Sequence, residues 1–120
     1  MTRPLVVKVT CGAEDAERCN QGFTVAAAAV AAGAEVSLWL TGEAAWYGVP
    51  GRAEQLDLPL ATPLADLLAA VVAGGTVTVC TQCASRRGIT AEQLVPGVQI
   101  RGAASFAEEV LQPEMQALVY

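Results

Sequence analysis

The sequence contains no histidine among its 120 residues, and this absence limits the metal chemistry that the protein can support. A structural zinc site takes four nitrogen or sulfur ligands, so all four cysteines would have to serve. Cys80 and Cys83 have the spacing of one zinc knuckle, but Cys11 and Cys19 are eight residues apart. That separation is not typical of a zinc-binding loop, and we therefore expect no metal site and no cofactor.

Positive charge is also scarce, since 7 lysines and arginines stand against 12 acidic residues and give a net charge of −5. The sequence pI of about 4.5 reflects the same imbalance. A nucleic-acid-binding protein needs a basic face, so this composition argues against a nucleic-acid partner.

No uninterrupted hydrophobic run is long enough to cross a membrane. Residues 24–33 are too few and mostly alanine, and residues 67–85 include a glycine pair and the polar side chains of Thr78, Thr81 and Gln82. The N-terminus shows no basic segment followed by an apolar core and a small-residue cleavage site. We therefore predict a soluble protein without a membrane partner, located in the cytoplasm.

Apolar residues are abundant, because they make up 53% of the chain and give a mean hydropathy of +0.42. Such a chain is not disordered, and its length suffices for one domain with a hydrophobic core but not for two. We expect a single domain over residues 1–120, with part of the apolar surplus buried between subunits. This core needs no disulfide scaffold, so the cysteines are expected to be reactive or simply buried.

Apolar periodicity and the positions of glycine and proline predict strands that alternate with helices. The expected strands cover residues 4–10, 35–40, 76–80, 98–102 and 117–120. The expected helices cover residues 16–32, 62–75 and 103–111, with shorter pieces at 83–87 and 90–94, and residues 41–59 are expected to be mainly loop. The alternation predicts a three-layer α/β/α fold, in which helices cover both faces of a five-stranded, mostly parallel sheet.

Single residues carry further structural expectations. Thr62 is predicted to cap the helix that starts at Pro63. Asp15 is predicted to cap or orient the N-terminus of the first helix, where a carboxylate is stabilised. Trp46 and Tyr47 are large amphipathic side chains in a segment expected to be exposed, and such side chains favour the interface of a homo-oligomer.

Ligands and chemistry in a parallel α/β sheet gather at the carboxyl ends of the strands. Three segments of this sequence are expected at that edge: CGAED at 11–15, TGEAAW at 41–46 and CTQC at 80–83. The sequence therefore predicts a functional site that includes Cys80 and Cys83.

The residues alone leave three interpretations of the Cys80–Cys83 pair open. One is dithiol redox chemistry, because a C-x-x-C between a strand and a helix is typical of thioredoxin-like proteins, and the helix N-terminus with Arg86 and Arg87 would favour the thiolate. The pair stands too late in the chain for a thioredoxin, however. Another is a pair of small buried side chains, as we expect for Cys19 inside its alanine-rich helix. The third is a cysteine that carries sulfur.

Residues 80–89, CTQCASRRGI, resemble the cysteine motif of the DsrE/DsrF-like family, including its YchN-like branch. In that motif a cysteine ends a central strand, a second cysteine often follows three residues later, and an Arg-Gly pair stands downstream. Cys80, Cys83, Arg87 and Gly88 occupy these positions.

The resemblance extends over most of the chain. Three further segments resemble the family in the same order: residues 12–19, 31–46 and 95–106. The first of them places Gly12, Asp15 and Arg18 at the positions of the family's opening Gly-x-x-Asp-x-x-Arg segment. Residues 43–51 depart from the pattern, because EAAWYGVPG replaces a short Asp-Gly-Val-type stretch, and we do not transfer the substrate or partner of any member to this chain.

The resemblance implies a homo-oligomer, a trimer or a hexamer, that handles sulfur as a sulfurtransferase or sulfur carrier. Cys80 would take sulfur from a donor protein as a persulfide and pass it to an acceptor protein, with Cys83 as the resolving thiol. Arg87, with Arg86, would supply positive charge to the thiolate. The remaining candidate surroundings are Gly88, Gly12, Asp15, Arg18 and Cys11. A non-enzymatic homo-oligomer that binds a small ligand at the same edge is the alternative.

Overall fold

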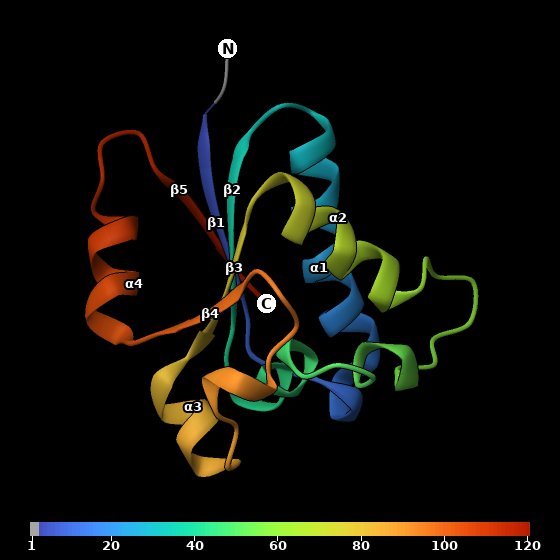
Figure 1. Ribbon diagram of the computed structural model, residues 1–120. Coiled ribbons are helices and arrows are strands. Elements are labelled where there is room, and N and C mark those ends of the chain that lie inside the picture. Colours follow the sequence, from blue (N-terminus) through green and yellow to red (C-terminus); the bar gives the residue numbers. More distant parts are fainter. Residues whose placement is uncertain (1–2) are drawn as a thin grey trace.

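Five parallel strands form one sheet through the middle of the protein, of which the computed structural model describes residues 3–120 (Figure 1). The strands are β1 (Pro4–Val9), β2 (Glu35–Leu40), β3 (Thr76–Cys80), β4 (Val98–Arg101) and β5 (Gln116–Val119). Their order across the sheet is β4-β3-β2-β1-β5, and every neighbouring pair is parallel. The carboxyl end of β3 therefore lies between the ends of β2 and β4.

Helices cover both faces of this sheet, which confirms the predicted three-layer α/β/α fold (Figure 1). α1 (Ala16–Ala31) and α2 (Leu64–Gly74) pack side by side on one face, and α4 (Ala103–Val110) lies on the other. α3 (Thr81–Arg86) follows β3 directly and lies beyond the carboxyl end of the sheet. Short 3-10 helices occupy four connections: η1 (Ala13–Asp15), η2 (Gly42–Gly48), η3 (Ala53–Gln55) and η4 (Ala91–Gln93).

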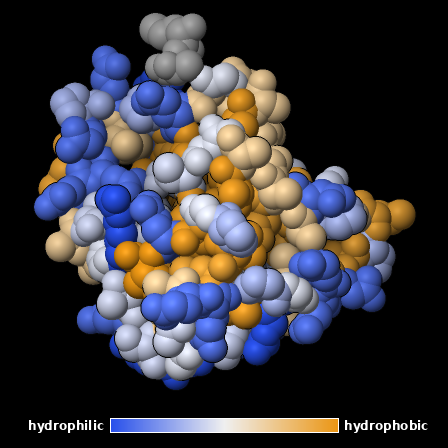
Figure 2. Space-filling view, viewed as in Figure 1, coloured by the Kyte–Doolittle hydropathy of each residue, from blue (hydrophilic) through white to orange (hydrophobic). Residues whose placement is uncertain are grey.

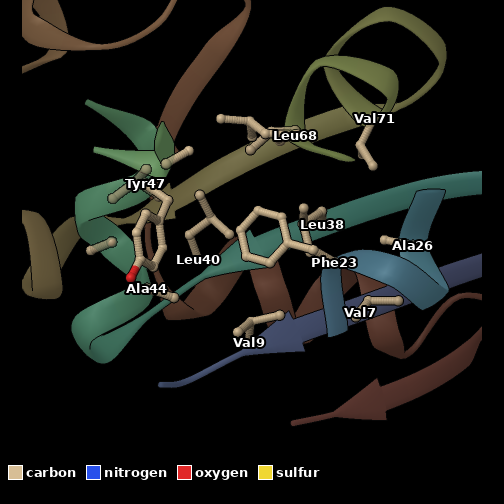
Figure 3. Close-up of a cluster of buried hydrophobic side chains, with 14 of the residues drawn as sticks. Val7, Val9, Phe23, Ala26, Leu38, Leu40, Ala44, Tyr47, Leu68 and Val71 are labelled. Carbon is tan, nitrogen blue, oxygen red and sulfur yellow. The ribbon is translucent and has the colours of Figure 1, made fainter. Parts of the chain in front are cut away.

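Alternate residues of each strand point to the sheet face under α1 and α2. These residues are apolar, so this face carries the hydrophobic core. Val7, Val9 and Leu40 are fully buried in this layer together with Phe23 of α1 (Figure 3). Tyr47 of η2 closes one end of the layer, with its ring edge-on to Phe23 at 6.1 Å between centroids. Burying each aliphatic side chain stabilises the fold by about 1.5–3 kcal/mol. The prediction that Tyr47 is exposed is therefore wrong.

The opposite face is more polar and is covered by α4. A row of residues in register crosses it: Lys8, Trp39, Thr78 and Gln99. Trp39 is buried, its Nε1 donates to Glu109 Oε2 at 3.3 Å, and its ring meets Phe106 edge-on at 5.3 Å between centroids. The Lys8 ammonium lies 4.9 Å from the Phe106 ring centroid. Because α4 has no fully buried residue, these contacts hold it against the sheet.

The predicted helices and strands agree with the structure apart from shifts of about two residues at several ends. The segment 41–59 differs most, because it contains η2 and η3 where mainly loop was expected. α2 begins at Leu64, with Pro63 instead of Thr62 at the N-cap, since Pro63 is still extended with ψ 135°. Thr90 is the N-cap of η4 and forms a capping box with Gln93, whose Oε1 accepts from the Thr90 N–H at 2.9 Å.

The surface carries hydrophobic side chains mainly over α2 and at the tip of the loop before it, whereas the α4 side is more hydrophilic (Figure 2). Leu60 lies in that loop, is completely exposed and has a left-handed backbone with φ 62°. A groove of about 400 Å³ runs beside α2, lined by residues that include Val49, Pro50, Ala65 and Leu68. No helix within residues 3–120 is long and apolar enough to cross a membrane.

Candidate functional site

Cys80 stands at the junction between β3 and α3. It is the last residue of the strand and the N-cap of the helix, with an extended backbone at φ −64° and ψ 130°. Its side chain is half-buried, and the next residues, Thr81 and Gln82, are exposed. The strand therefore fixes the backbone of Cys80 while its thiol stays near the surface.

The surroundings of Cys80 favour its thiolate. Burial by itself would raise the pKa of Cys80, but hydrogen bonds from the main-chain N–H groups of Cys83 and Gln82 lower it. A hydrogen bond from the Cys83 side chain and the positive charge of Lys8 act in the same direction. The pKa of Cys80 is thus lower than that of an ordinary cysteine. In a larger fraction of the molecules, Cys80 is therefore the nucleophilic thiolate at neutral pH.

Cys83 lies in the first turn of α3 and is buried. Its Sγ accepts a hydrogen bond from the main-chain N–H of Gly42 at 3.2 Å, across the gap between α3 and η2. Cys80 and Cys83 are free thiols. Cys83 is therefore less accessible than Cys80.

Arg87 joins α3 to η2. Its Nε and Nη2 donate to Glu43 Oε2 at 2.9 and 2.7 Å, and its Nη1 donates to the main-chain oxygen of Cys83 at 3.1 Å. The Arg87 side chain is 19% exposed and that of Glu43 is 49% exposed, so this ion pair is partly shielded from water. The charge of Arg87 is balanced by Glu43, whereas Arg86 is exposed at the end of α3.

Gly88 ends α3 with a backbone conformation that favours glycine. Its φ is +66°, the N–H of Ile89 donates to the oxygen of Ala84, and the N–H of Gly88 donates to the oxygen of Ser85. This pattern is a Schellman motif, in which glycine is preferred at the left-handed position. The Arg-Gly pair therefore contributes one residue to the site and one to the turn that follows it.

The opening segment of the predicted site lies at the end of β1, with β2 between it and β3. A Cβ on Gly12 would stand 3.1 Å from the Cβ of Glu43, so Gly12 allows η2 to approach. Asp15 occupies the N-cap of α1, but its side chain makes no capping hydrogen bond, and the predicted capping role is wrong. The Asp15 carboxylate pairs instead with Arg18 at 3.3 Å on an exposed surface.

Cys11 and Cys19 are buried beside this segment. Burial, together with the charges of Cys11, Glu14 and Asp15, raises the pKa of Cys19 to about 12. Burial and the nearby carboxylates of Asp15 and Glu14 also raise the pKa of Cys11. Both thiols stay protonated at neutral pH, and the expectation that Cys19 is a buried hydrophobic side chain is confirmed.

Sequence reasoning missed three residues of the site: Lys8 and Gly42, which act on the cysteine pair, and Glu43, which pairs with Arg87. Lys8 is the single charged residue of β1, and such a charge inside an apolar strand was the available signal. Gly42 and Glu43 follow β2 within a segment already placed at the functional edge. Their contacts with α3 depend on the fold of η2, which residue spacing did not predict.

The fold agrees with comparison to known proteins. The sequence model of the DsrE/DsrF-like family matches residues 5–115, and the chain belongs to this family. The crystal structure of the YchN protein from E. coli aligns over 100% of both chains, with a TM-score of 0.79 at 19% identity. A conserved protein of unknown function from Bacteroides thetaiotaomicron aligns over 98% of this chain and 95% of its own, with a TM-score of 0.62 at 16% identity. No curated protein matches the chain in sequence.

Proposed function

We propose that the protein carries sulfur on Cys80, which takes it from a donor protein as a persulfide and passes it to an acceptor protein. The observation that carries this proposal is the contrast among four thiols. The pKa of Cys80 is lowered and its side chain is partly exposed, whereas the other three are buried. Membership of a family linked to sulfur relay supports the same chemistry.

Loading of Cys80 needs no oxidant or reductant. The Cys80 thiolate attacks the outer sulfur of a donor persulfide, a new S–S bond forms on Cys80, and the donor leaves as a thiolate. The persulfide on Cys80 is itself anionic, so the N–H groups of Gln82 and Cys83 and the charge of Lys8 stabilise it as they do the thiolate. Transfer to an acceptor thiolate is the reverse reaction with a different partner.

Mass spectrometry after incubation with a cysteine desulfurase and cysteine tests the proposal. The wild-type protein should gain one sulfur atom, located on Cys80, and Cys80→Ser should gain none. Cys83→Ser should still load and then retain its sulfur longer, because the resolving thiol is missing. Cys11→Ser is the matched control, since Cys11 is buried and stays protonated, and it should load like wild type. Loading of Cys80→Ser at the wild-type rate would refute the carrier role.

Two other functions predict different results in this experiment. A dithiol redox protein would form a Cys80–Cys83 disulfide with a small oxidant and gain no sulfur. A non-enzymatic oligomer that binds a small ligand at the strand ends would leave all four thiols unmodified in both treatments. Localisation in the cytoplasm stays a prediction from the sequence.

A further inference from the structure

One contact at the site has no role in the loading of Cys80: the hydrogen bond from Gly42 N–H to Cys83 Sγ, 3.2 Å long. It joins two segments that are 41 residues apart in sequence. The Gly42 backbone has φ +54°, and a Cβ at this position would collide with the main-chain oxygen of Thr10. Glycine is therefore needed to aim this amide at the sulfur.

Neighbouring residues hold the two segments together. Glu43 follows Gly42 directly and accepts two hydrogen bonds from Arg87, at 2.7 and 2.9 Å, and Arg87 also donates to the Cys83 carbonyl at 3.1 Å. Gly12 lets Glu43 approach, since any Cβ there would stand 3.1 Å from the Glu43 Cβ. Arg87 thus links Glu43, the neighbour of Gly42, to the backbone of Cys83. Gly42 and Cys83 are the two partners of the N–H···S hydrogen bond.

We propose that Gly42, with the Glu43–Arg87 ion pair that fixes it, is a positioning residue for Cys83: it holds this thiol toward Cys80 for the step in which Cys83 releases whatever Cys80 carries. The proposal rests on the proposed function only for the identity of that cargo. It concerns the release of the cargo by Cys83, whereas the amides of α3 and the charge of Lys8 act on the loading of Cys80.

The step is balanced without a further reagent. When Cys80 carries an anionic persulfide, the Cys83 sulfur attacks the inner sulfur, a Cys80–Cys83 disulfide forms and the bond to the outer sulfur breaks. The outer sulfur takes the electron pair of that bond and the proton of Cys83, and leaves as hydrosulfide. The outer sulfur is reduced, and Cys83 is oxidised to the disulfide.

An aromatic disulfide that releases a coloured thiolate, 5,5′-dithiobis(2-nitrobenzoate), tests this step without any sulfur donor. Cys80 attacks the reagent and releases the first thiolate, and Cys83 then attacks the mixed disulfide on Cys80 and releases the second. In stopped-flow absorbance the wild type should show two phases. Cys83→Ser should show the first phase alone.

Glu43→Gln keeps the shape of the side chain and removes the ion pair. It should slow the second phase about fivefold, the factor expected for losing an ion pair worth about 1 kcal/mol. The first phase should change less, because the Cys83 side chain is only one of several groups that lower the pKa of Cys80. Arg87→Gln should behave alike and Arg87→Lys should recover part of the rate, because lysine keeps the charge but not the two-pronged geometry. Glu54→Gln, an exposed carboxylate on η3, is the control and should change neither phase.

Gly42→Ala should slow the second phase more than Glu43→Gln, because the amide itself is displaced. If this variant fails to fold, Glu43→Gln still decides the matter. The proposal is overturned if the wild type lacks a second phase, or if Glu43→Gln changes both phases equally or neither. Absence of persulfide loading in a protein that shows the two phases would refute the proposed function and leave the positioning role standing.

Discussion

At the scale of single residues, Cys80 and Cys83 differ in the hydrogen bonds and charges that act on each sulfur and in its exposure to solvent. Cys80 receives the main-chain N–H groups at the start of α3 and the field of Lys8, and it is partly exposed. Cys83 receives one amide from the opposite loop and is buried. Thiolate character and access together set thiol reactivity, so two cysteines of one motif take separate roles.

The lowered pKa of Cys80 predicts the pH dependence of its alkylation. A lowered pKa means that the thiolate persists as pH falls below the ordinary value of 9.0. The rate of reaction with iodoacetamide should therefore reach half of its maximum below that pH. Lys8→Met should move the midpoint to higher pH, because the cation that favours the thiolate is lost. Arg86→Met should leave the midpoint unchanged, and a shift as large as that of Lys8→Met would restore the role that the sequence suggested for the arginine.

Gly88→Ala should destabilise the protein by about 1 kcal/mol, because its φ of +66° is unfavourable for a residue with a Cβ. Urea unfolding followed by circular dichroism measures the free energy of unfolding. Ser85→Ala, at an exposed right-handed position of α3, is the control. Equal destabilisation by the two substitutions would contradict the left-handed cap as the cause.

At the scale of elements, the sequence predicted the strands and helices, because local residue patterns determine them. The β-branched run TVTVC placed Cys80 at the end of a strand, and parallel pairing then brought it to the edge that holds Gly12 and η2. Tyr47 was misjudged, because glycine and proline around it suggest an open loop, whereas tertiary packing against Phe23 folds the segment as η2. Arg18 competes for the Asp15 carboxylate, which is why a residue at the N-cap makes no cap.

α4 is the α-helix held least by burial, because it has no buried residue, and this predicts local opening. It packs on the sheet through Phe106 and Glu109, which contact Trp39. Phe106→Ala should increase amide hydrogen exchange in α4 and lower the free energy of unfolding by about 1–3 kcal/mol, less than a fully buried phenylalanine would cost. Leu111→Ala, at the end of the same helix and 80% exposed, should leave exchange nearly unchanged. An equal effect of both would show that Phe106 does not anchor the helix.

At the scale of the whole molecule, the prediction of a homo-oligomer has to be related to the apolar residues that are exposed. The expectation of a homo-oligomer was based partly on Trp46 and Tyr47, but Tyr47 is buried and Trp46 is half-buried with Arg52 stacked 4.1 Å from its ring centroid. Within residues 3–120, the large hydrophobic side chains that remain exposed are elsewhere: Leu60, Leu111, Leu118 and Val119. An exposed leucine with a left-handed backbone destabilises the monomer. Burial of the Leu60 side chain in a contact between subunits would offset this cost.

Leu60→Ser should therefore weaken self-association. We expect multi-angle light scattering to give a mass of three or six chains for the wild type at micromolar concentration, and a smaller mass for Leu60→Ser. Removing a fully exposed side chain has little effect on a folded monomer, so the free energy of unfolding of Leu60→Ser measured below the association range should match that of the wild type. Leu111→Ser, equally apolar but on the α4 side, is the matched control for a nonspecific loss of hydrophobic surface. A wild-type mass of 12.4 kDa, that of one chain, would reject the oligomer, because Leu60 would then face water in the working protein.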